Sequence, residues 1–502
     1  MAFGLTFQKT VLVCCMAIAA MLLSLGFTGS DLSSICGLDA SQKTPQDSIA
    51  EAANYTSSLE ECTSVIVTGS AAKDGRAILM KNRDSSEEEN IPVYHPATNT
   101  TFAFVAVNSL WMGINEKGLA VMNTAMPALS DSPYAGSYNG ILNQRILQTC
   151  QDVTDVEVKL KADDSPLLPD PGSPEESVAT CVGVIDSHGL GAFFEIGDLY
   201  VSVEYVADGY QSRANHPRTY PGLASGPSGR DQHALDALDA ILAEKGAISW
   251  QDVAQRVSRY VREKQTGSDE FRIGGEVCND YTVSAMVAVS GDSRYDGRLN
   301  IMWCEYGPVP MTGVFLPSMA YGGSLPSILN DMVSYTQVKR NYACDIDTGF
   351  YDSLRVRKIQ NYSFAAEDYT FEQYDRLIDF IPEGLSDAQL NETLNDFIRL
   401  TVSVATDMYV NESSTRPKYA VPFVVDAIPT VPTTRTETTS ATATPSITSA
   451  TTKQTTSVSE IDSYVLAGTM IVAGLTSGVL LALAIRSIQI SKRSLASQCA
   501  LT

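Results

Sequence analysis

An apolar run near the C-terminus constrains this chain more than any other feature. Residues Tyr464–Ile485 carry no charge and are long enough to span a bilayer as one helix. Arg486 and two further basic residues follow the run closely, and two acidic residues precede it. Basic residues favour the cytoplasmic side of a membrane. The sequence therefore predicts a single-pass cell-membrane protein with an extracellular body, a transmembrane helix at residues 464–485 and a cytoplasmic tail at residues 486–502.

Two other segments are not expected to contribute to a folded core. Pro429–Ser459 is dominated by Thr, Ser, Ala and Pro, a composition typical of an O-glycosylated stalk. The apolar run Val11–Phe27 after Lys9 is typical of a secretory signal peptide, with an uncleaved membrane anchor as the alternative. The expected boundaries are residues 1–29 for the signal peptide, 30–61 for a propeptide or linker, 62–426 for the folded domain and 427–463 for the stalk.

The overall composition is that of a globular protein with an acidic surface. Of 502 residues, 44% are hydrophobic and 19% charged, and 58 acidic against 35 basic residues give a net charge of −23. This balance argues against nucleic acid as a partner. The ten cysteines include no C-x-x-C spacing, so neither a metal site nor a cofactor is predicted. An extracellular body favours one or two disulfides among Cys150, Cys181, Cys278, Cys304 and Cys344.

Strand and helix patterns occur in blocks along the body. Alternating or β-branched runs predict strands at Thr101–Val107, Trp111–Asn115, Leu119–Asn123, Thr180–Asp186, Gly191–Ile196, Tyr200–Tyr205, Tyr281–Val289 and Leu299–Cys304. Helical spacing predicts helices at Ile141–Cys150, His233–Lys245 and Trp250–Lys264, and further helices between Ser324 and Met408. Strands, then helices, then strands and helices again are typical of an α+β fold with stacked antiparallel sheets.

The segment from Cys62 to Asp84 predicts a β-hairpin with chemical groups at its open end. The run Val65–Val67 is β-branched, and Asp74-Gly75 is a favoured pair for a tight turn. The hairpin begins at a cysteine and returns to the charged cluster Lys81-Asn82-Arg83-Asp84. A strand that returns a carboxylate to a nucleophile is a catalytic arrangement. We therefore interpret Cys62 as a new N-terminus, formed by cleavage of the Glu61–Cys62 bond.

A cysteine at an N-terminus carries its own base. Its α-amine has an ordinary pKa of about 7.7–8.0, so it can accept the thiol proton without a histidine. While Cys62 is in peptide linkage its nitrogen is an amide, and the site is latent. Asp84 is expected to hold or orient the amine. Lys81 or Arg83 is expected to keep the site electropositive and to lower the thiol pKa.

Three motifs in this order resemble those of the N-terminal-nucleophile hydrolases. The closest branch contains acyl-CoA:6-aminopenicillanic acid acyltransferase, penicillin V acylase and the choloylglycine hydrolases, with related cysteine dipeptidases. The motifs are Cys62-Thr63-Ser64, Lys81-Asn82-Arg83-Asp84 and Gly113-Ile114-Asn115-Glu116-Lys117-Gly118-Leu119-Ala120, and the resemblance runs from Cys62 to about Pro317. It implies a four-layer αββα sandwich of stacked antiparallel sheets.

The resemblance also implies roles for individual residues. Cys62 would be the nucleophile and, through its amine, the base, while Asp84 would position that amine. Asn123 and Asn215 would donate hydrogen bonds to the oxyanion. Lysine stands at position 81, where the family usually has arginine, and no late arginine is evident near Tyr281-Thr282-Val283-Ser284. Glu61 also differs from the small residue often found before the nucleophile.

The sequence thus predicts a membrane-anchored extracellular amidohydrolase that acts on linear amide bonds of acyl-amino acid or dipeptide-like substrates. An acyltransferase using the same acyl-enzyme is one alternative. A non-catalytic cell-surface protein with a degenerate hydrolase fold is another, in which Cys62 is a buried strand cysteine, Asp84 a structural carboxylate, and Asn123 and Asn215 loop caps. His216 is interpreted as a loop histidine. The sequence does not indicate an oligomeric state.

Overall fold

The computed structural model describes residues 62–410, except residues 87–89, 171, 174, 199, 228, 262–268, 322–328 and 330. The predicted signal peptide, propeptide or linker, stalk, transmembrane helix and cytoplasmic tail all lie outside the described residues. Within the described residues, no helix combines the length and the apolar character needed to cross a membrane.

Two antiparallel sheets form the centre of the fold. The first has six strands in the order β10-β1-β2-β12-β13-β14. Its strands are β1 (Cys62–Thr68), β2 (Ala77–Asp84), β10 (Gly209–Arg213), β12 (Thr282–Ser290), β13 (Ile301–Tyr306) and β14 (Leu316–Ser318). The predicted hairpin is confirmed, because β1 and β2 pair antiparallel from Cys62 opposite Arg83 to Val67 opposite Ile78. Gly75, in the connection between them, has a φ of 75°, as the Asp-Gly turn requires.

The second sheet is a meander of seven strands in sequence order, from β3 to β9. Its strands are β3 (Pro92–His95), β4 (Phe104–Val107), β5 (Met112–Asn115), β6 (Ala120–Ala125), β7 (Thr180–Ile185), β8 (Gly191–Gly197) and β9 (Tyr200–Val206). The predicted tight turn after β5 is confirmed: Gly118 has a φ of 77°, and its amide donates to the carbonyl of Asn115 at 2.9 Å.

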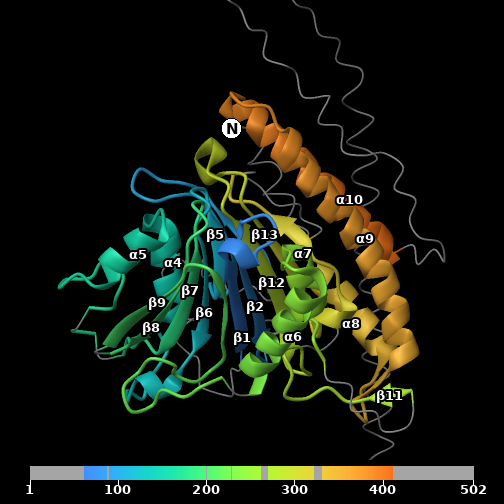
Figure 1. Ribbon diagram of the computed structural model, residues 1–502, viewed down its shortest axis with the longest axis horizontal. Coiled ribbons are helices and arrows are strands. Elements are labelled where there is room, and N and C mark those ends of the chain that lie inside the picture. Colours follow the sequence, from blue (N-terminus) through green and yellow to red (C-terminus); the bar gives the residue numbers. More distant parts are fainter. Residues whose placement is uncertain are drawn as a thin grey trace, which may run out of the picture. The chain divides into compact units, whose positions relative to one another are not determined.

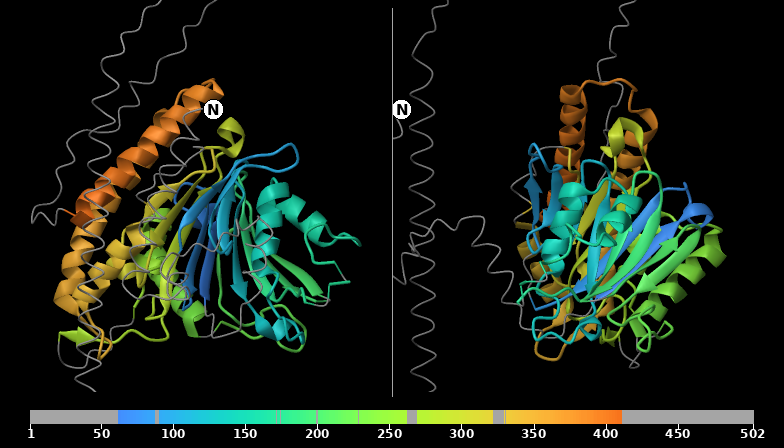
Figure 2. Two further views of the ribbon diagram at one scale, coloured as in Figure 1. Left: turned by 180° about the vertical axis from the view of Figure 1, so that it is seen from behind. Right: turned by 90° about the vertical axis from the view of Figure 1, so that its left-hand side faces the viewer.

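Helices cover the outer faces of both sheets (Figures 1 and 2). On the seven-stranded sheet, α4 (Asn139–Thr149) and α5 (Val153–Leu160) pack through a cluster that includes Leu142, Ile146, Val121 and Phe194. The six-stranded sheet is covered by α6 (Gly229–Lys245), α7 (Trp250–Asp252), the π-helical turn η3 (Val253–Val257), α8 (Met332–Ala343), α9 (Ser353–Phe380) and α10 (Asp387–Val410). The predicted α+β class with stacked antiparallel sheets is confirmed, and the layers run helices, sheet, sheet, helices.

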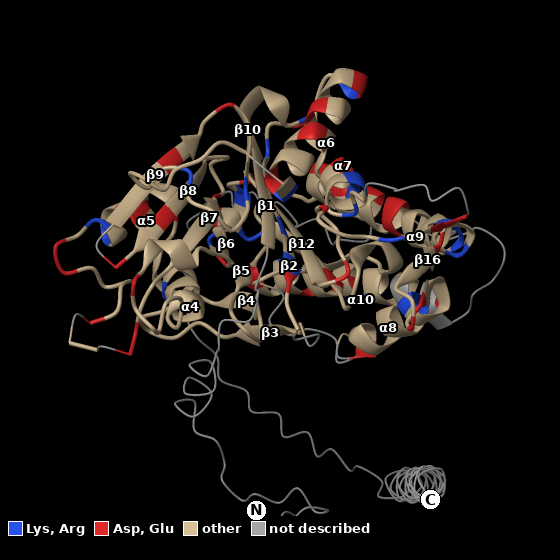
Figure 3. Cartoon of the chain, turned by 90° about the horizontal axis from the view of Figure 1, so that it is seen from below, with Lys and Arg blue, Asp and Glu red and all other residues tan. Residues whose placement is uncertain are grey.

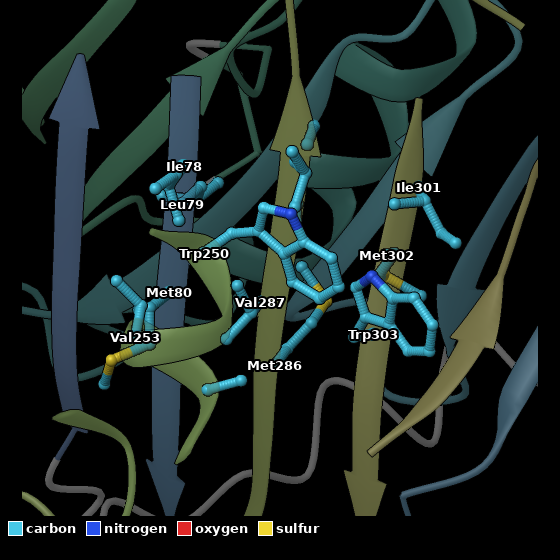
Figure 4. Close-up of a cluster of buried hydrophobic side chains, with 14 of the residues drawn as sticks. Ile78, Leu79, Met80, Trp250, Val253, Met286, Val287, Ile301, Met302 and Trp303 are labelled. Carbon is cyan, nitrogen blue, oxygen red and sulfur yellow. The ribbon is translucent and has the colours of Figure 1, made fainter. Parts of the chain in front are cut away.

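Aromatic packing joins the helical layer to the six-stranded sheet. Trp303 on β13 stacks on Trp250 of α7, with ring centroids 5.3 Å apart, and Figure 4 shows the two indoles on the face of the sheet that carries Val287. Phe371 of α9 meets both indoles edge-on. Large buried aromatic rings contribute strongly to core energetics. This cluster therefore anchors the C-terminal helices to the strand layer that carries Cys62.

Smaller elements complete the fold. A third, three-stranded sheet has the order β11-β16-β15. Its strands are β11 (Glu270–Phe271), β15 (Cys344–Asp345) and β16 (Phe350–Asp352), and the 3-10 turns are η1 (Gly69–Ala71), η2 (Pro127–Leu129), η4 (Arg294–Gly297) and η5 (Pro310–Thr312). Acidic residues are spread over α5, α6, α7 and α9, with basic residues interspersed among them (Figure 3).

Several expectations about secondary structure need correction. The helix predicted over 250–264 is only three residues long as α7 and continues as η3, because the chain shifts there to π-type hydrogen bonds such as Ser258 N to Val253 O. The expected apolar face of the helix predicted over 233–245, with Leu235, Leu238 and Leu242, is wrong in part: Leu235 and Leu242 are only partly buried, and Ala234, Ala237, Leu238 and Ile241 are buried. Strands β3, β10 and β14 were not predicted.

The disulfide prediction is wrong for the described residues. Cys150, Cys181, Cys278, Cys304 and Cys344 are all free and buried. They pack as small apolar side chains in hydrophobic clusters, Cys181 and Cys304 in one, Cys278 and Cys344 in a second, and Cys150 in a third. Burial raises the pKa of the Cys150 thiol to about 12 and raises the pKa of the Cys181, Cys278 and Cys304 thiols as well. These thiols are therefore held in their unreactive, protonated form.

Candidate active site

The open end of the β1–β2 hairpin places Cys62 on the face between the two sheets. Cys62 and Arg83 are opposite each other in the ladder, so their side chains share a face. Ser64, two residues further along β1, approaches Thr124 of β6 at 3.3 Å between hydroxyl oxygens, which identifies this as the inter-sheet face. Cys62 is 3% exposed. The nucleophile predicted from sequence is therefore enclosed rather than on the surface.

Lys81 is a buried cation on this same face. Its ammonium donates to the backbone carbonyl of Asn123 on β6 and, at 3.4 Å, to the side-chain Oδ1 of the same residue. It also lies 4.9 Å from the centre of the Trp111 ring, and the Arg83 guanidinium lies 5.3 Å from that ring. The Trp111 indole N–H donates to Asn90 at 2.9 Å. Lys81 and Arg83, the two predicted cations, therefore both make cation–π contacts with the Trp111 ring.

The contact with Lys81 decides which way the Asn123 amide faces. An ammonium can only donate, so the atom beside it must be the carbonyl oxygen Oδ1. Nδ2 of Asn123 then points elsewhere, and no described residue accepts a hydrogen bond from it. It is absent from the buried polar atoms that lack a partner, so solvent reaches it. Asn123 therefore presents an uncommitted N–H donor beside the face that carries Cys62.

Asp84 lies on the opposite face of β2, because neighbouring strand residues alternate. Its two carboxylate oxygens accept hydrogen bonds from Asn279 Nδ2 and Thr282 Oγ1, each at 2.7 Å. Oδ2 also lies 3.7 Å from the guanidinium of Arg230. Asp84 is therefore a fully buried carboxylate fixed by neutral donors and by one arginine.

Asn215 connects this second face to the backbone nitrogen of Cys62. Its Oδ1 accepts a hydrogen bond from Cys62 N at 2.6 Å and another from Arg230 at 3.0 Å. Its Nδ2 donates to the carbonyl of Ala125, at the end of β6, at 2.8 Å. Two donors meet at one end of the side chain and one acceptor at the other, so this orientation is also fixed by its partners. Asn215 faces the nitrogen that cleavage would convert to an amine.

Two buried carboxylates hold the loop that carries Asn215. Glu195 of β8 accepts from the backbone amides of Arg218 and Thr219, at 2.7 and 2.9 Å. Asp231 of α6 accepts from the Arg218 guanidinium at 2.8 Å and lies 3.4 Å from His216 Nε2. His216 lies in a loop, as predicted, and is directed at Asp231. These contacts fix residues 213–219 between β8 and α6.

Arg230 is a site residue that sequence reasoning did not identify. It lies in the first turn of α6 and contacts both Asp84 and Asn215, which the sequence had placed in the site without a link between them. Nothing in the local sequence marks it, because Gly229-Arg230-Asp231 reads only as the start of a helix. Its neighbour Asp231 offered no stronger signal, although both residues contact the site loop.

The structure therefore brings all six predicted site residues to one end of β1 and β2. Cys62, Lys81, Arg83 and Asn123 gather between the sheets, and Asp84 and Asn215 lie beside Arg230. Their chemical roles stay predictions. No cluster of metal-ligating side chains occurs among the described residues.

Comparison with solved structures finds similarities at low sequence identity. The chain resembles a mutant conjugated bile acid hydrolase from Clostridium perfringens, with 14% identity and a TM-score of 0.33, over 51% of this chain and 92% of that chain. It also resembles penicillin V acylase from Agrobacterium tumefaciens, with 14% identity and a TM-score of 0.30, over 51% of this chain and 86% of that chain.

No protein-family model matches the chain, and no curated protein matches it either. What this chain does is therefore inferred from its own contacts.

Proposed function

We propose that this protein is an amidohydrolase whose nucleophile is Cys62, active once the Glu61–Cys62 bond is cut. One observation carries the proposal: the buried end of β1 joins a thiol, an uncommitted amide donor on Asn123 and an acceptor on Asn215 that binds the Cys62 nitrogen. A thiol, a base and an oxyanion donor are the three parts that amide cleavage by a covalent route needs.

The reaction would proceed in two halves. The neutral α-amine takes the thiol proton, and the thiolate adds to the substrate carbonyl carbon. The resulting oxyanion accepts the Asn123 Nδ2 hydrogen bond. Collapse of this intermediate breaks the C–N bond, the ammonium returns the proton to the departing nitrogen, and a thioester on Cys62 remains. Water then adds to the thioester with the amine as base, and release of the acid restores the thiol.

The substrate class and the setting are part of the proposal. A small linear amide, such as an acyl-amino acid or a dipeptide-like compound, suits an enclosed thiol. The charge-free run at 464–485 and the Thr/Ser-rich segment before it support anchoring at the cell membrane, with the catalytic domain outside the cell. Protease protection of the domain in sealed membrane vesicles of known orientation tests this topology.

Cleavage before Cys62 is the primary test. Intact-mass analysis and N-terminal sequencing of the purified full-length protein should find a chain that begins at Cys62. A preparation that hydrolyses amides while keeping the Glu61–Cys62 bond intact contradicts the proposal.

The nucleophile is tested by two substitutions assayed on a panel of small acyl amides. Cys62→Ala should lower turnover to background, a loss of at least about a thousandfold. Cys62→Ser keeps an oxygen nucleophile and should retain a trace of activity. Full activity in Cys62→Ala rules the proposal out. Added amine acceptors that divert the acyl group from water would indicate the acyltransferase alternative.

A further inference from the structure

The nitrogen of Cys62 lies close to a fixed positive charge. Cys62 N and the Arg230 guanidinium donate to the same oxygen, Asn215 Oδ1, over 2.6 and 3.0 Å. The two nitrogens are therefore within about 6 Å of each other by these bond lengths. Arg230 is only 11% exposed, so solvent screens its charge weakly.

Asp84, a carboxylate beside Arg230, is also held by other groups. Asp84 accepts from Asn279 and Thr282, and its Oδ2 lies 3.7 Å from Arg230. A carboxylate that is neutralised in this way stabilises a neighbouring ammonium less than a free carboxylate does. Further charged groups lie on the elements around β1: Lys81 and Arg83 on β2, Asp231 on α6, and Arg213, His216 and Arg218 at the end of β10 and in the loop after it.

We propose that Arg230 is a positioning residue whose guanidinium keeps the freed amine of Cys62 neutral and able to accept the thiol proton. This inference rests on the proposed function. Protonation of the amine would place an ammonium beside the guanidinium, and like charges within 4–6 Å disfavour the charged form. Arg230 also donates to Asn215 Oδ1, so it helps to keep that oxygen directed at the amine.

Arg230 takes the electrostatic role at the site that the sequence had assigned to Lys81 or Arg83. Lys81 and Arg83 project from β2 toward Trp111, and Lys81 is bound to Asn123. Arg230, by contrast, shares an acceptor with the reacting nitrogen itself. The shared acceptor therefore connects Arg230 to the base.

The test measures protonation of the α-amine without relying on an unidentified substrate. Full-length, processed protein is treated with methyl methanethiosulfonate to block the thiol, and then with limiting acetic anhydride over a range of pH. Acetylation of the amine on the peptide that begins at Cys62 is followed by mass spectrometry. Arg230→Gln should raise the apparent pKa of this amine by about one unit. Arg230→Lys keeps the charge and should stay near the wild-type value.

Arg256→Gln is the matched control, because Arg256 lies in the same helical layer and pairs with Glu244 on the surface. It should leave the amine titration unchanged. A wild-type titration in Arg230→Gln, or an equal shift in Arg256→Gln, overturns the inference while leaving the proposed function standing. If no chain begins at Cys62, the proposed function itself fails. Should Arg230→Gln not fold, an Arg230→Lys titration shifted upward as far as one unit would also overturn the role of charge.

Arg230→Gln also shows whether Arg230 lowers the pKa of the Cys62 amine or only stabilises the fold. On any acyl amide that the wild-type protein cleaves, the acidic limb of kcat/KM against pH should move upward in Arg230→Gln, with activity recovering as pH rises. A uniform loss at every pH shows a structural role only and contradicts the proposal.

Discussion

The two sides of Cys62 differ in how completely their polar groups are used. Between the sheets, Lys81 binds Asn123 and leaves one amide N–H without an acceptor among the described residues. On the other side, both ends of Asn215 are occupied, and Asn279, Thr282 and Arg230 hold Asp84. An amide N–H that only solvent meets can donate instead to a carbonyl oxygen of a bound substrate. The open donor on Asn123 therefore suggests a place for a substrate oxygen.

The difference indicates separate roles for Asn123 and Asn215, to which the sequence had assigned the same role. Both were predicted as oxyanion donors. Asn123 has the donor available, whereas Asn215 uses its Nδ2 on Ala125 and offers its oxygen to the Cys62 nitrogen. On this basis we expect Asn123 to act on the substrate carbonyl and Asn215 to act on the base.

The largest effect is expected from the donor on Asn123. Asn123→Asp keeps an oxygen for Lys81 to bind but removes the N–H, so kcat should fall by about 100- to 1000-fold. Steady-state kinetics on an acyl amide cleaved by the wild-type protein measures this loss, and thermal unfolding checks that the fold is retained. If Asn123→Asp keeps more than about a tenth of wild-type kcat, the division between the two asparagines is wrong.

A smaller loss is expected from Lys81, which acts through Asn123. Lys81→Met keeps the length of the side chain but removes the ammonium that fixes Oδ1, so kcat should fall by about 10- to 100-fold. Lys81→Arg restores a donor and should recover part of the activity. In the double variant with Asn123→Asp, the two losses should not add, because residues that share one contact are coupled. Additive losses would show that Lys81 acts independently, for example on the thiol.

The sequence indicated the hairpin and its end well, because those features are local. A β-branched run and an Asp-Gly turn indicate two strands that begin at Cys62 and end at Asp84, whereas their register, with Cys62 opposite Arg83, is seen only in the structure. The orientation of Asn123 could not be foreseen, since it depends on Lys81 reaching across from the other sheet. Arg230 was missed for the same reason: its role exists only once α6 packs beside the loop 213–219.

Two further errors came from effects that are decided in three dimensions. The five body cysteines looked suitable for disulfides from the expected location, but each is a free, buried thiol packed among apolar side chains. Strand β10 escaped prediction because Gly209–Arg213 has a weak strand composition and is positioned by its pairing with β1. Pairing with a neighbouring strand can therefore make a strand of a segment whose own residues have only a weak strand preference.

The smallest effect is expected from Glu305, a buried carboxyl group outside the site. Its titration changes the stability of the fold with pH, which an activity assay would register as a pH effect at Cys62. Glu305 on β13 is fully buried in the strand layer that also contains Cys62, and burial raises its pKa well above the ordinary value, with Arg259 opposing the shift and Glu367 adding to it. The folded protein therefore keeps this carboxyl protonated while the unfolded chain ionises it. Above the unfolded pKa, near about 4.3, stability should fall as pH rises, by up to about 1.4 kcal/mol per pH unit.

Glu305→Gln should remove this dependence. Its melting temperature relative to the wild-type protein should rise between pH 5 and pH 8, and thermal unfolding at several pH values measures the difference. The amine titration of Cys62 should stay unchanged in Glu305→Gln, because Glu305 pairs across the sheet with Ala285 and is not among the contacts of the Cys62 nitrogen. If Glu305→Gln shifts the pKa of the Cys62 amine as far as Arg230→Gln does, any buried charge in the strand layer affects that amine. The electrostatic role given to Arg230, on the Asn215 side of Cys62, is then wrong.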